Sequence, residues 1–577
     1  MKIVGYVVAA AIVVTACHSD TISGPVSSLV TPTCGAASVV TLSVNQAATL
    51  ACSSGSFVNL AGGARYLIVP QLASGGLQSG IPYRAVAYQI GVSSSATHAL
   101  SATHPVSASM VPAATSGPLA VPRFGMQQQF DAALRRRARL AVASGQWRNA
   151  ATVASRASAR DVSAAIVPAA GTLRNFQVLS GTNLNSASFI SATARLAFVG
   201  TNLLVYVDTL APANGFTASQ LQSFSQYFDQ TLYPLDITTF GQPADIDGNG
   251  RVIMLLSPTV NAFTTTAQCN SSGFVAGYFD GLDFSASNNS NQGEIFYGLV
   301  PDPNGTLSCG HLVSDLLTIL PATFLHELQH LISFSQHVTV RNGQPEEGWL
   351  DEGMSIRAEE LGSEYFEAKF PPPTGRKDPA QIFPDSAQPF YLGFLGDSYN
   401  YLQRTDTASV TLHSDADNGL QWRGGDWLLL HWLGDLKGKA VYTTLEHGAT
   451  TGIANIAAAA GESFGTLFGD FSLTLWTDSI VGEPRSAIPL RDRLQSRNLR
   501  QLYARLSVTS GVAPYPFSPT VLTTTAPVSA TLVPGSMAFY LLDLSASTST
   551  VAIQFAAPGG TALSATLNPQ VSIYRLP

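Results

Sequence analysis

The feature that most constrains this chain is the motif HELQH, which runs from His326 to His330. Two histidines four residues apart on a helix lie on one face, one turn from each other. Both imidazoles can then bind one zinc ion at about 2.0–2.1 Å. Glu327 lies about 100° around the helix axis from His326, where its carboxylate can reach a water molecule on the metal. The motif therefore predicts a zinc site that leaves a position open for water.

The residues around the motif predict a half-buried helix. Leu325, Leu328, Leu331 and Ile332 recur at helical spacing, so one side of the helix is apolar. Pro321 precedes them and suits a first helical turn, where its missing N–H is harmless. We therefore expect the helix to begin near Pro321.

Two later residues compete for the position of third zinc ligand. His337 lies seven residues after His330, about 10.5 Å further along a continuing helix, which is too far to share one ion. A related zinc motif has a glycine that bends the chain and a histidine ligand six residues after the second histidine. It is also excluded, because Ser333 stands in place of the glycine. Glu352 follows 22 residues after His330 and opens a second helical pattern. We therefore choose Glu352 and expect His337 at a helix end or on the surface.

The segments HELQH and Trp349-Leu350-Asp351-Glu352-Gly353, with Glu359–Glu360 after them, resemble the gluzincin metallopeptidases. The closer resemblance is to the hyicolysin-like family of secreted bacterial zinc peptidases, over about residues 170–510 and most strongly over 321–362. It implies an α+β multidomain fold with a thermolysin-like catalytic domain of mixed sheet and active-site helices. It also implies that His326, His330 and Glu352 bind zinc and that Glu327 is the general base.

Two further roles follow from the resemblance. Glu359 lies seven positions after Glu352 and so on the same helix face; relatives of the aminopeptidase type carry an acidic residue there that supports the ligands. The transition-state oxyanion needs another donor, and relatives tend to carry a tyrosine near the start of a later helix, where this chain has Arg423. The candidates for this donor are Arg423, Tyr391, Tyr399 and Tyr401.

The N-terminal residues predict export. Lys2 is followed by an apolar stretch over 3–14 that is too short to span a bilayer. The sequence Val14-Thr15-Ala16-Cys17 resembles a bacterial lipobox, which implies cleavage before Cys17 and a lipid on its thiol. The alternative is an ordinary secretory signal cleaved nearby. We expect an extracytoplasmic protein that contacts the membrane of the cell envelope through acyl chains, or a secreted one.

The remaining cysteines predict two disulfides. An even number in an exported chain favours pairing, and proximity in the sequence favours Cys34–Cys52 and Cys269–Cys309 among the three connectivities.

The charge pattern argues against nucleic-acid binding, since the net charge is −7 and the pI about 5.8. Arg135–Arg137 and Arg139 are an exception within a polar helical stretch over 127–143. We expect them to form a solvated helix face.

At 577 residues the chain is too long for one core. We expect a signal peptide (1–16), a β-rich N-terminal sandwich module (17–120), a helical or linker segment (121–170), the metallopeptidase domain (171–509) and a C-terminal β module (510–577). Within the catalytic domain we expect buried strands at 203–207, 252–256 and 294–297 and a helix over 218–232. The resemblance to the gluzincins implies that the strand at 294–297 lines the cleft and pairs with extended substrate.

A calcium loop is suggested by Asp245, Asp247 and Asn249, which occupy positions 1, 3 and 5 of such a loop, with Gly250 at position 6. Position 12 is Leu256 rather than glutamate, and it falls in a predicted strand. We therefore favour a tight turn of Asp, Asn and Gly over a calcium loop, which is kept as the alternative.

The sequence thus favours an exported, lipid-anchored zinc endopeptidase that hydrolyses protein or peptide substrates. One alternative is a non-enzymatic surface-binding lipoprotein with a decayed peptidase core, against which the intact set of His326, Glu327, His330 and Glu352 argues. The other is an aminopeptidase, which would need an acidic group for the substrate's free amine.

Overall fold

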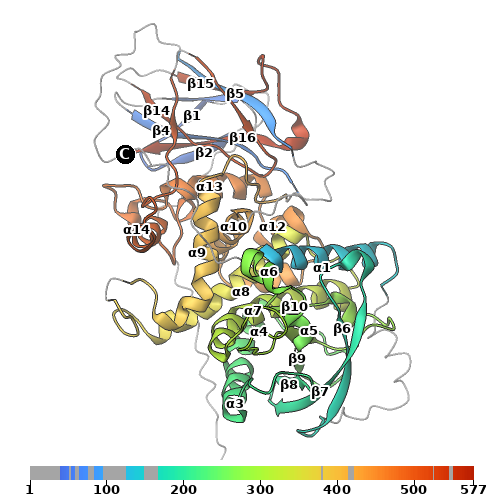
Figure 1. The fold of residues 1–577 in the computed structure, drawn as a ribbon. Coiled ribbons are helices and arrows are strands. Elements are labelled where there is room, and N and C mark those ends of the chain that lie inside the picture. The colour runs from blue at the N-terminus through green and yellow to red at the C-terminus, as the bar shows by residue number, and fades with distance from the viewer. Residues whose placement is uncertain are drawn as a thin grey trace, which may run out of the picture.

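Three β-sheets and a group of helices make up the described part of the chain (Figure 1). The computed structural model describes residues 39–50, 54–58, 64–75, 84–94, 125–147, 167–378, 381–412, 421–523, 526–544 and 550–577. The architecture is mixed α+β with several domains, as the sequence predicts. Cys17, Cys34 and Cys52 lie outside the described residues, so the lipid anchor and the first disulfide stay predictions.

One sheet contains the strands that the sequence predicts for the catalytic part. Its order is β10 (Gly277–Phe279), β11 (Ile295–Gly298), β9 (Val252–Leu256), β8 (Leu203–Asp208), β7 (Phe189–Val199) and β6 (Leu173–Leu179). Strand β9 lies between β8 and β11 and is parallel to both. Every residue of β9 and β11 is buried, as expected of parallel strands covered on both faces. The predictions at 203–207 and 252–256 are confirmed.

The strand beside the cleft differs from the prediction. The strand predicted at 294–297 is β11, but it lies inside the sheet between β9 and β10. The edge strand is β10, which runs antiparallel to β11. Only an edge strand has backbone groups free to pair with another chain, so β10 takes the position expected for β11.

The helices follow in chain order and most of those after α8 lie between the six-stranded sheet and the other two sheets (Figure 1). They are α1 (Gly125–Ala143), α3 (Ala218–Tyr227), α4 (Tyr233–Phe240), α5 (Pro258–Asn261), α6 (Thr266–Ser272), α7 (Val313–Phe334), α8 (Gly348–Lys369), α9 (Gln388–Leu402), α10 (Gln421–Lys437), α11 (Ala440–Glu446), α12 (Gly452–Ala460), α13 (Phe464–Thr477) and α14 (Leu499–Ser510). Short turns of other helical types are η3 (Leu184–Ser186), η4 (Phe228–Leu232), η5 (Gly281–Phe284), η6 (Ser335–Val340), η7 (Asp385–Ala387), η8 (Arg485–Ala487), η9 (Leu490–Asp492) and η10 (Ala565–Leu567). The helix predicted over 218–232 is α3 continued by η4.

The other two sheets combine strands from both ends of the chain. One has the order β12 (Thr520–Val521), β14 (Tyr540–Leu544), β4 (Ala64–Leu72), β16 (Pro569–Leu576) and β2 (Ala47–Leu50). The other has the order β1 (Val39–Thr41), β3 (Ser54–Val58), β15 (Thr550–Ala556), β5 (Val86–Ser94) and β13 (Val528–Leu532). Residues of both sheets, among them Ile68, Ile90, Ile553 and Ile573, belong to one apolar cluster.

This arrangement differs from the separate N- and C-terminal modules that the sequence predicts. Strand β4 lies between β14 and β16, and β5 lies between β13 and β15, so the stretches before 120 and after 510 complete each other's sheets. Alternating apolar residues show that a strand has a buried face, but they do not show which strand it pairs with. The described strands of the two stretches therefore form one sandwich.

Helix α1 contradicts the prediction of a solvated helix over 127–143. The helix itself is confirmed, but Phe130, Asp131, Leu134, Arg135 and Ala138 are buried. Two hydrogen-bond partners of Arg135 lie 144 and 192 residues further along the chain. Because these partners are distant in the sequence, the local charge pattern could not reveal the burial.

A search of the described helices for one long and apolar enough to cross a membrane finds none.

The shared sandwich can be tested by a cross-link between its two ends. Thr49 on β2 and Ser572 on β16 are direct partners, and their hydroxyl oxygens are 2.8 Å apart. We expect Thr49→Cys with Ser572→Cys to form a disulfide, because directly opposed residues suit its geometry. The measurement is a mobility shift on non-reducing gels that reductant abolishes. Thr49→Cys with Ser529→Cys is the control, since β13 lies in the other sheet; a cross-link in the control alone would contradict the pairing.

Candidate metal centre

Helix α7 carries the HELQH motif in its buried second half. Phe324, Leu325, Leu328, Leu331 and Ile332 are at most 1% exposed, as the predicted helical spacing requires. The helix begins at Val313 rather than near Pro321, which lies in its interior. Leu316 and Leu320 are fully buried, so apolar packing continues the helix N-terminally past the proline that removes one hydrogen bond.

The three predicted ligands converge from α7 and α8. The Nε2 atoms of His326 and His330 are 3.2 Å apart. The carboxylate of Glu352 lies 3.6 Å from each of them, through different oxygens. Two nitrogens bound tetrahedrally at about 2.0–2.1 Å from one zinc would lie about 3.3 Å apart. The residues present therefore fit a zinc ion held by His326, His330 and Glu352.

A carboxylate orients each histidine from behind. Glu359 Oε1 lies 2.8 Å from His326 Nδ1, and Asp351 Oδ2 lies 3.0 Å from His330 Nδ1. An imidazole that donates its Nδ1–H to a carboxylate presents the Nε2 lone pair to a metal. The sequence predicts this position for Glu359. It missed Asp351, although that residue directly precedes Glu352 and could have been sought one step around the same helix.

Burial and neighbouring charges shift the pKa values of the cluster in different directions. Burial works to lower the pKa of His326, but hydrogen bonds to Glu352 and Glu359 outweigh it and raise this pKa to about 10. Burial and the nearby Arg135 lower the pKa of His330. Burial works against the charged form of Glu352, yet Arg423 and the histidines hold its pKa well below the usual range. These charges stabilise the ionised form of Glu352, which is the form that binds a metal.

Of the four candidates for the transition-state donor, Arg423 lies at the ligands. Its Nη2 atom is 2.8 Å from Glu352 Oε2 and 3.2 Å from His326 Nε2. The three tyrosines are on α9 and none is among the described residues that line the cavity over the site. Tyr399 and Tyr401 are fully buried, and Tyr391 stacks on Phe383. The geometry therefore keeps Arg423 as the candidate donor.

Glu327 lies beside the ligands but is engaged by residues that the sequence did not indicate. Its Oε2 atom accepts hydrogen bonds from Arg135 Nη2 at 2.9 Å and from the Phe279 backbone N–H at 3.0 Å. Its Oε1 atom is buried and has no hydrogen-bond partner among the described residues. A carboxylate oxygen of Asp131 also lies within 4.8 Å of both Glu327 and His326. Helix α1 therefore reaches the centre of the site.

A cavity of about 600 Å³ opens over these groups. It is lined by His326, Glu327, Glu359, Arg423 and, from α1, Asp131. Apolar side chains such as Ile356 and Leu392 complete its walls. A cavity with convergent polar groups and a largely apolar lining is typical of a small-molecule or peptide site.

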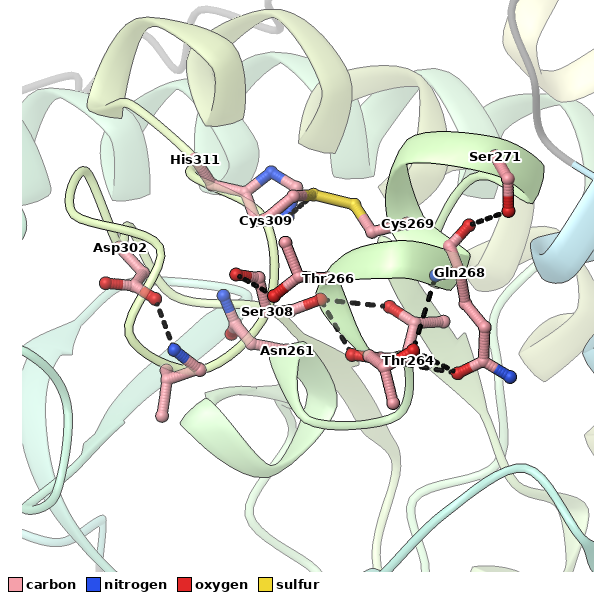
Figure 2. Close-up of a disulfide and its surroundings, with 12 residues drawn as sticks. Asn261, Thr264, Thr266, Gln268, Cys269, Ser271, Asp302, Ser308, Cys309 and His311 are labelled. Carbon is pink, nitrogen blue, oxygen red and sulfur yellow. Dashed lines mark hydrogen bonds between the residues drawn. A yellow bond between two sulfur atoms is a disulfide. The ribbon is translucent and has the colours of Figure 1, made fainter.

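The predicted disulfide Cys269–Cys309 is present and lies in the wall of this cavity (Figure 2). It joins α6 to the segment that leads into α7, with a Cα–Cα distance of 5.9 Å. His311 Nε2 lies 3.5 Å from the Cys309 sulfur. A cross-link here restrains two segments that bound the cavity.

His337, which the sequence predicts at a helix end or on the surface, lies in η6 and is 3% exposed. Its Nε2 atom is 3.8 Å from Glu346 and 4.0 Å from Glu446. It is therefore at a helix end but buried, and it belongs to a separate acidic pocket rather than to the metal ligands.

Comparison with known proteins supports a metallopeptidase relationship. The chain is 27% identical over 192 residues to the neutral metalloprotease ShpI of Staphylococcus hyicus. This alignment covers 33% of the chain and 40% of ShpI, so the chain matches less than half of that relative's length. No protein-family model matches the chain. A distant homologue is thus a neutral metalloprotease, and the His326, His330 and Glu352 group is one that could bind a metal.

The two carboxylates behind the histidines predict an effect on metal affinity. We expect Asp351→Asn and Glu359→Gln each to weaken zinc binding by about 10–100-fold, because a neutral partner makes the imidazole a poorer ligand. Competition with a fluorescent zinc chelator measures this affinity. Glu364→Gln is the control, since Glu364 pairs with Arg357 and Lys439 elsewhere on the surface of α8. Unchanged affinity in both variants would contradict the orienting role.

Proposed function

We propose that the chain is a zinc endopeptidase of the gluzincin type, similar to the hyicolysin-like peptidases. The observation that carries this proposal is the meeting of His326, His330 and Glu352 around one point, with Glu327 beside them in a cavity. The similarity to a neutral metalloprotease supports the same class of reaction. The alternative of a decayed core is disfavoured because both imidazoles also keep their orienting carboxylates.

The chain's own residues account for the proton transfers. When bound, zinc would polarise the scissile carbonyl and lower the pKa of a water molecule. Glu327 would accept the proton from that water at Oε1, the oxygen without a partner among the described residues, and pass it to the leaving amine. The guanidinium of Arg423 would donate to the developing oxyanion.

The proposed substrate is a polypeptide in extended conformation. Strand β10 forms the edge of the six-stranded sheet and packs next to α7, which carries the motif. An extended peptide can add to such an edge through main-chain hydrogen bonds. This mode of binding favours internal cleavage over release of single terminal residues, and it requires the groups along β10 to be accessible.

The proposed location is outside the cytoplasm, on the basis of the signal-like sequence of residues 1–17. An export signal with a lipid on Cys17 would hold the enzyme at the cell envelope, where external protein is the available substrate.

Glu327→Gln tests the proposed chemistry. We expect about one bound zinc in both wild type and variant, and loss of casein cleavage by at least about 100-fold in the variant, because the amide cannot accept the proton. Zinc content is measured by atomic absorption and products by mass spectrometry. Glu364→Gln, which loses only the pairing with Arg357 and Lys439, should cleave normally.

Three outcomes would contradict the proposal: zinc-free wild-type protein, equal cleavage by Glu327→Gln, or products that are exclusively single amino acids. The last would favour the aminopeptidase alternative.

A further inference from the structure

Three carboxylates meet at a point away from the cavity. Asp245 and Asp247 lie in the loop before β9, and Glu294 directly precedes β11. Because β9 and β11 are parallel neighbours, the segments that lead into them lie at the same edge of the sheet. One oxygen from each of the three residues lies within 4.8 Å of the other two.

The buried side chain of Glu294 indicates that this cluster binds a cation. Its side chain is 2% exposed, and Oε1 accepts a hydrogen bond from the Ile246 N–H at 2.7 Å. Its Oε2 atom is buried and has no hydrogen-bond partner among the described residues. A buried carboxylate oxygen without a partner is costly. In the described part of the chain, Arg174 pairs with this cluster at Asp247, 3.9 Å away.

We propose that Asp245, Asp247 and Glu294 bind one calcium ion. Three carboxylates are hard oxygen ligands, and backbone carbonyls and water can complete the six to eight positions that calcium takes. No histidine or cysteine belongs to the group, which disfavours zinc.

In this site Glu294 takes the place that the calcium loop considered from the sequence gives to Asn249. The Asn249 amide donates to Asp247 Oδ2 at 2.7 Å, and its oxygen accepts from the Arg251 N–H at 2.6 Å. Both polar ends of Asn249 are thus used within the turn. Glu294, 38 positions beyond Leu256 in the chain, supplies the carboxylate that a helical calcium loop would carry at its twelfth position.

Calcium titration of the zinc-loaded full chain tests this site. We expect about one equivalent to bind by isothermal titration calorimetry, and the melting temperature to rise by several degrees. Glu294→Gln and Asp247→Asn should each weaken binding by at least about tenfold, since each removes a charged ligand. Asp543→Asn, in the sandwich beside Arg65, is the matched control.

His330→Ala separates this site from the zinc centre and should leave calcium binding unchanged. Absence of calcium binding by the wild type, full binding by both carboxylate variants, or loss of binding in His330→Ala would each overturn the proposal.

A second, independent observation concerns α1, whose polar residues line up over the proposed zinc centre. Gln127, Asp131 and Arg135 are spaced by four, so they lie on one face of the helix. Gln127 exchanges hydrogen bonds with the Gly277 carbonyl and the Ala276 N–H at 2.8 and 2.7 Å. Those backbone groups lie at β10, on the edge that an extended peptide would use.

The next two turns of α1 engage the catalytic groups. Asp131 is fully buried and its Oδ2 atom has no hydrogen-bond partner among the described residues. Its carboxylate lies within 4.8 Å of His326 and Glu327. Arg135 binds Glu327 Oε2 at 2.9 Å and lies 3.7 Å from Asp351. Gln127 thus covers the strand edge proposed for substrate, Asp131 lies on the approach to the metal, and Arg135 pairs with the proposed base.

We infer that α1 holds the proposed peptidase in a latent form. Asp131 would occupy the space beside His326 and Glu327 that the water needs, and Arg135 would hold Glu327 as an ion pair. Substrate would gain access when α1 leaves this position. This inference rests on the proposed function and adds to it a control of the same site.

Two substitutions on α1 test the latent form in the full chain. With Asp131→Asn or Arg135→Gln we expect casein cleavage to rise by about tenfold, the size of one lost charge-assisted contact. With Asp131→Asn we also expect phenanthroline to remove zinc faster, because a negative charge beside His326 is missing. Arg136→Gln, on the exposed face of α1, is the control for both measurements.

The two readouts distinguish the possible failures. Lower cleavage in both variants with unchanged zinc removal would make Asp131 and Arg135 part of the catalytic machinery and overturn the latent form. Unchanged values in both readouts would show α1 to be only structural. Zinc-free, inactive wild type and variants would instead contradict the proposed function itself. Thermal unfolding of each variant establishes that it has folded.

Discussion

The burial of charge between α7 and its neighbours is the constraint on which the rest of the structure depends. His326, Glu327, His330 and Glu352 are each at most 5% exposed. An isolated ionised group in such a place costs several kcal/mol, so each must find a partner of opposite charge. The partners come from three other places: Asp351 and Glu359 on α8, Arg423 on α10 and Arg135 on α1. The packing of these helices is therefore fixed by charge as well as by apolar contact.

The six-stranded sheet contacts the candidate site directly, whereas the sandwich packs on helices around it. The sheet supports α7 through β10 and β11, and the backbone N–H of Phe279, the last residue of β10, donates a hydrogen bond to Glu327. The sandwich packs on α13 through β16, β2 and β4, well away from the ligands. Its strands come from both ends of the chain, so closing it brings the segments before α1 and after α14 together. The helices that carry the candidate site are thus enclosed between the six-stranded sheet and the sandwich.

The local part of this organisation could be predicted from the sequence, and the non-local part could not. The four-residue spacing of His326 and His330 and the apolar residues around them determine a buried helix with one metal-facing side. The roles of Glu352 and Glu359 were predicted from their positions on a second helix and from the resemblance to the gluzincins. Asp131 and Arg135 were missed because a polar helix looks the same whether its partners are water or residues almost 200 positions away. Strand pairing in the sandwich was missed for the same reason.

The composition of α1 is best explained by a role beyond stability. Phe130, Leu134 and Ala138 already anchor this helix in the apolar core. Buried ion pairs contribute little net stability compared with apolar residues of similar volume, so Asp131 and Arg135 are not what such a helix needs in order to pack. Asp131 and Arg135 instead lie beside groups that hydrolysis would use, namely His326 of the proposed ligand set and the proposed base Glu327. Gln127 on the same helix bonds to the edge of β10. A helix that is secured by its apolar residues, and that complements the proposed catalytic groups with the neighbouring polar ones, can control the site.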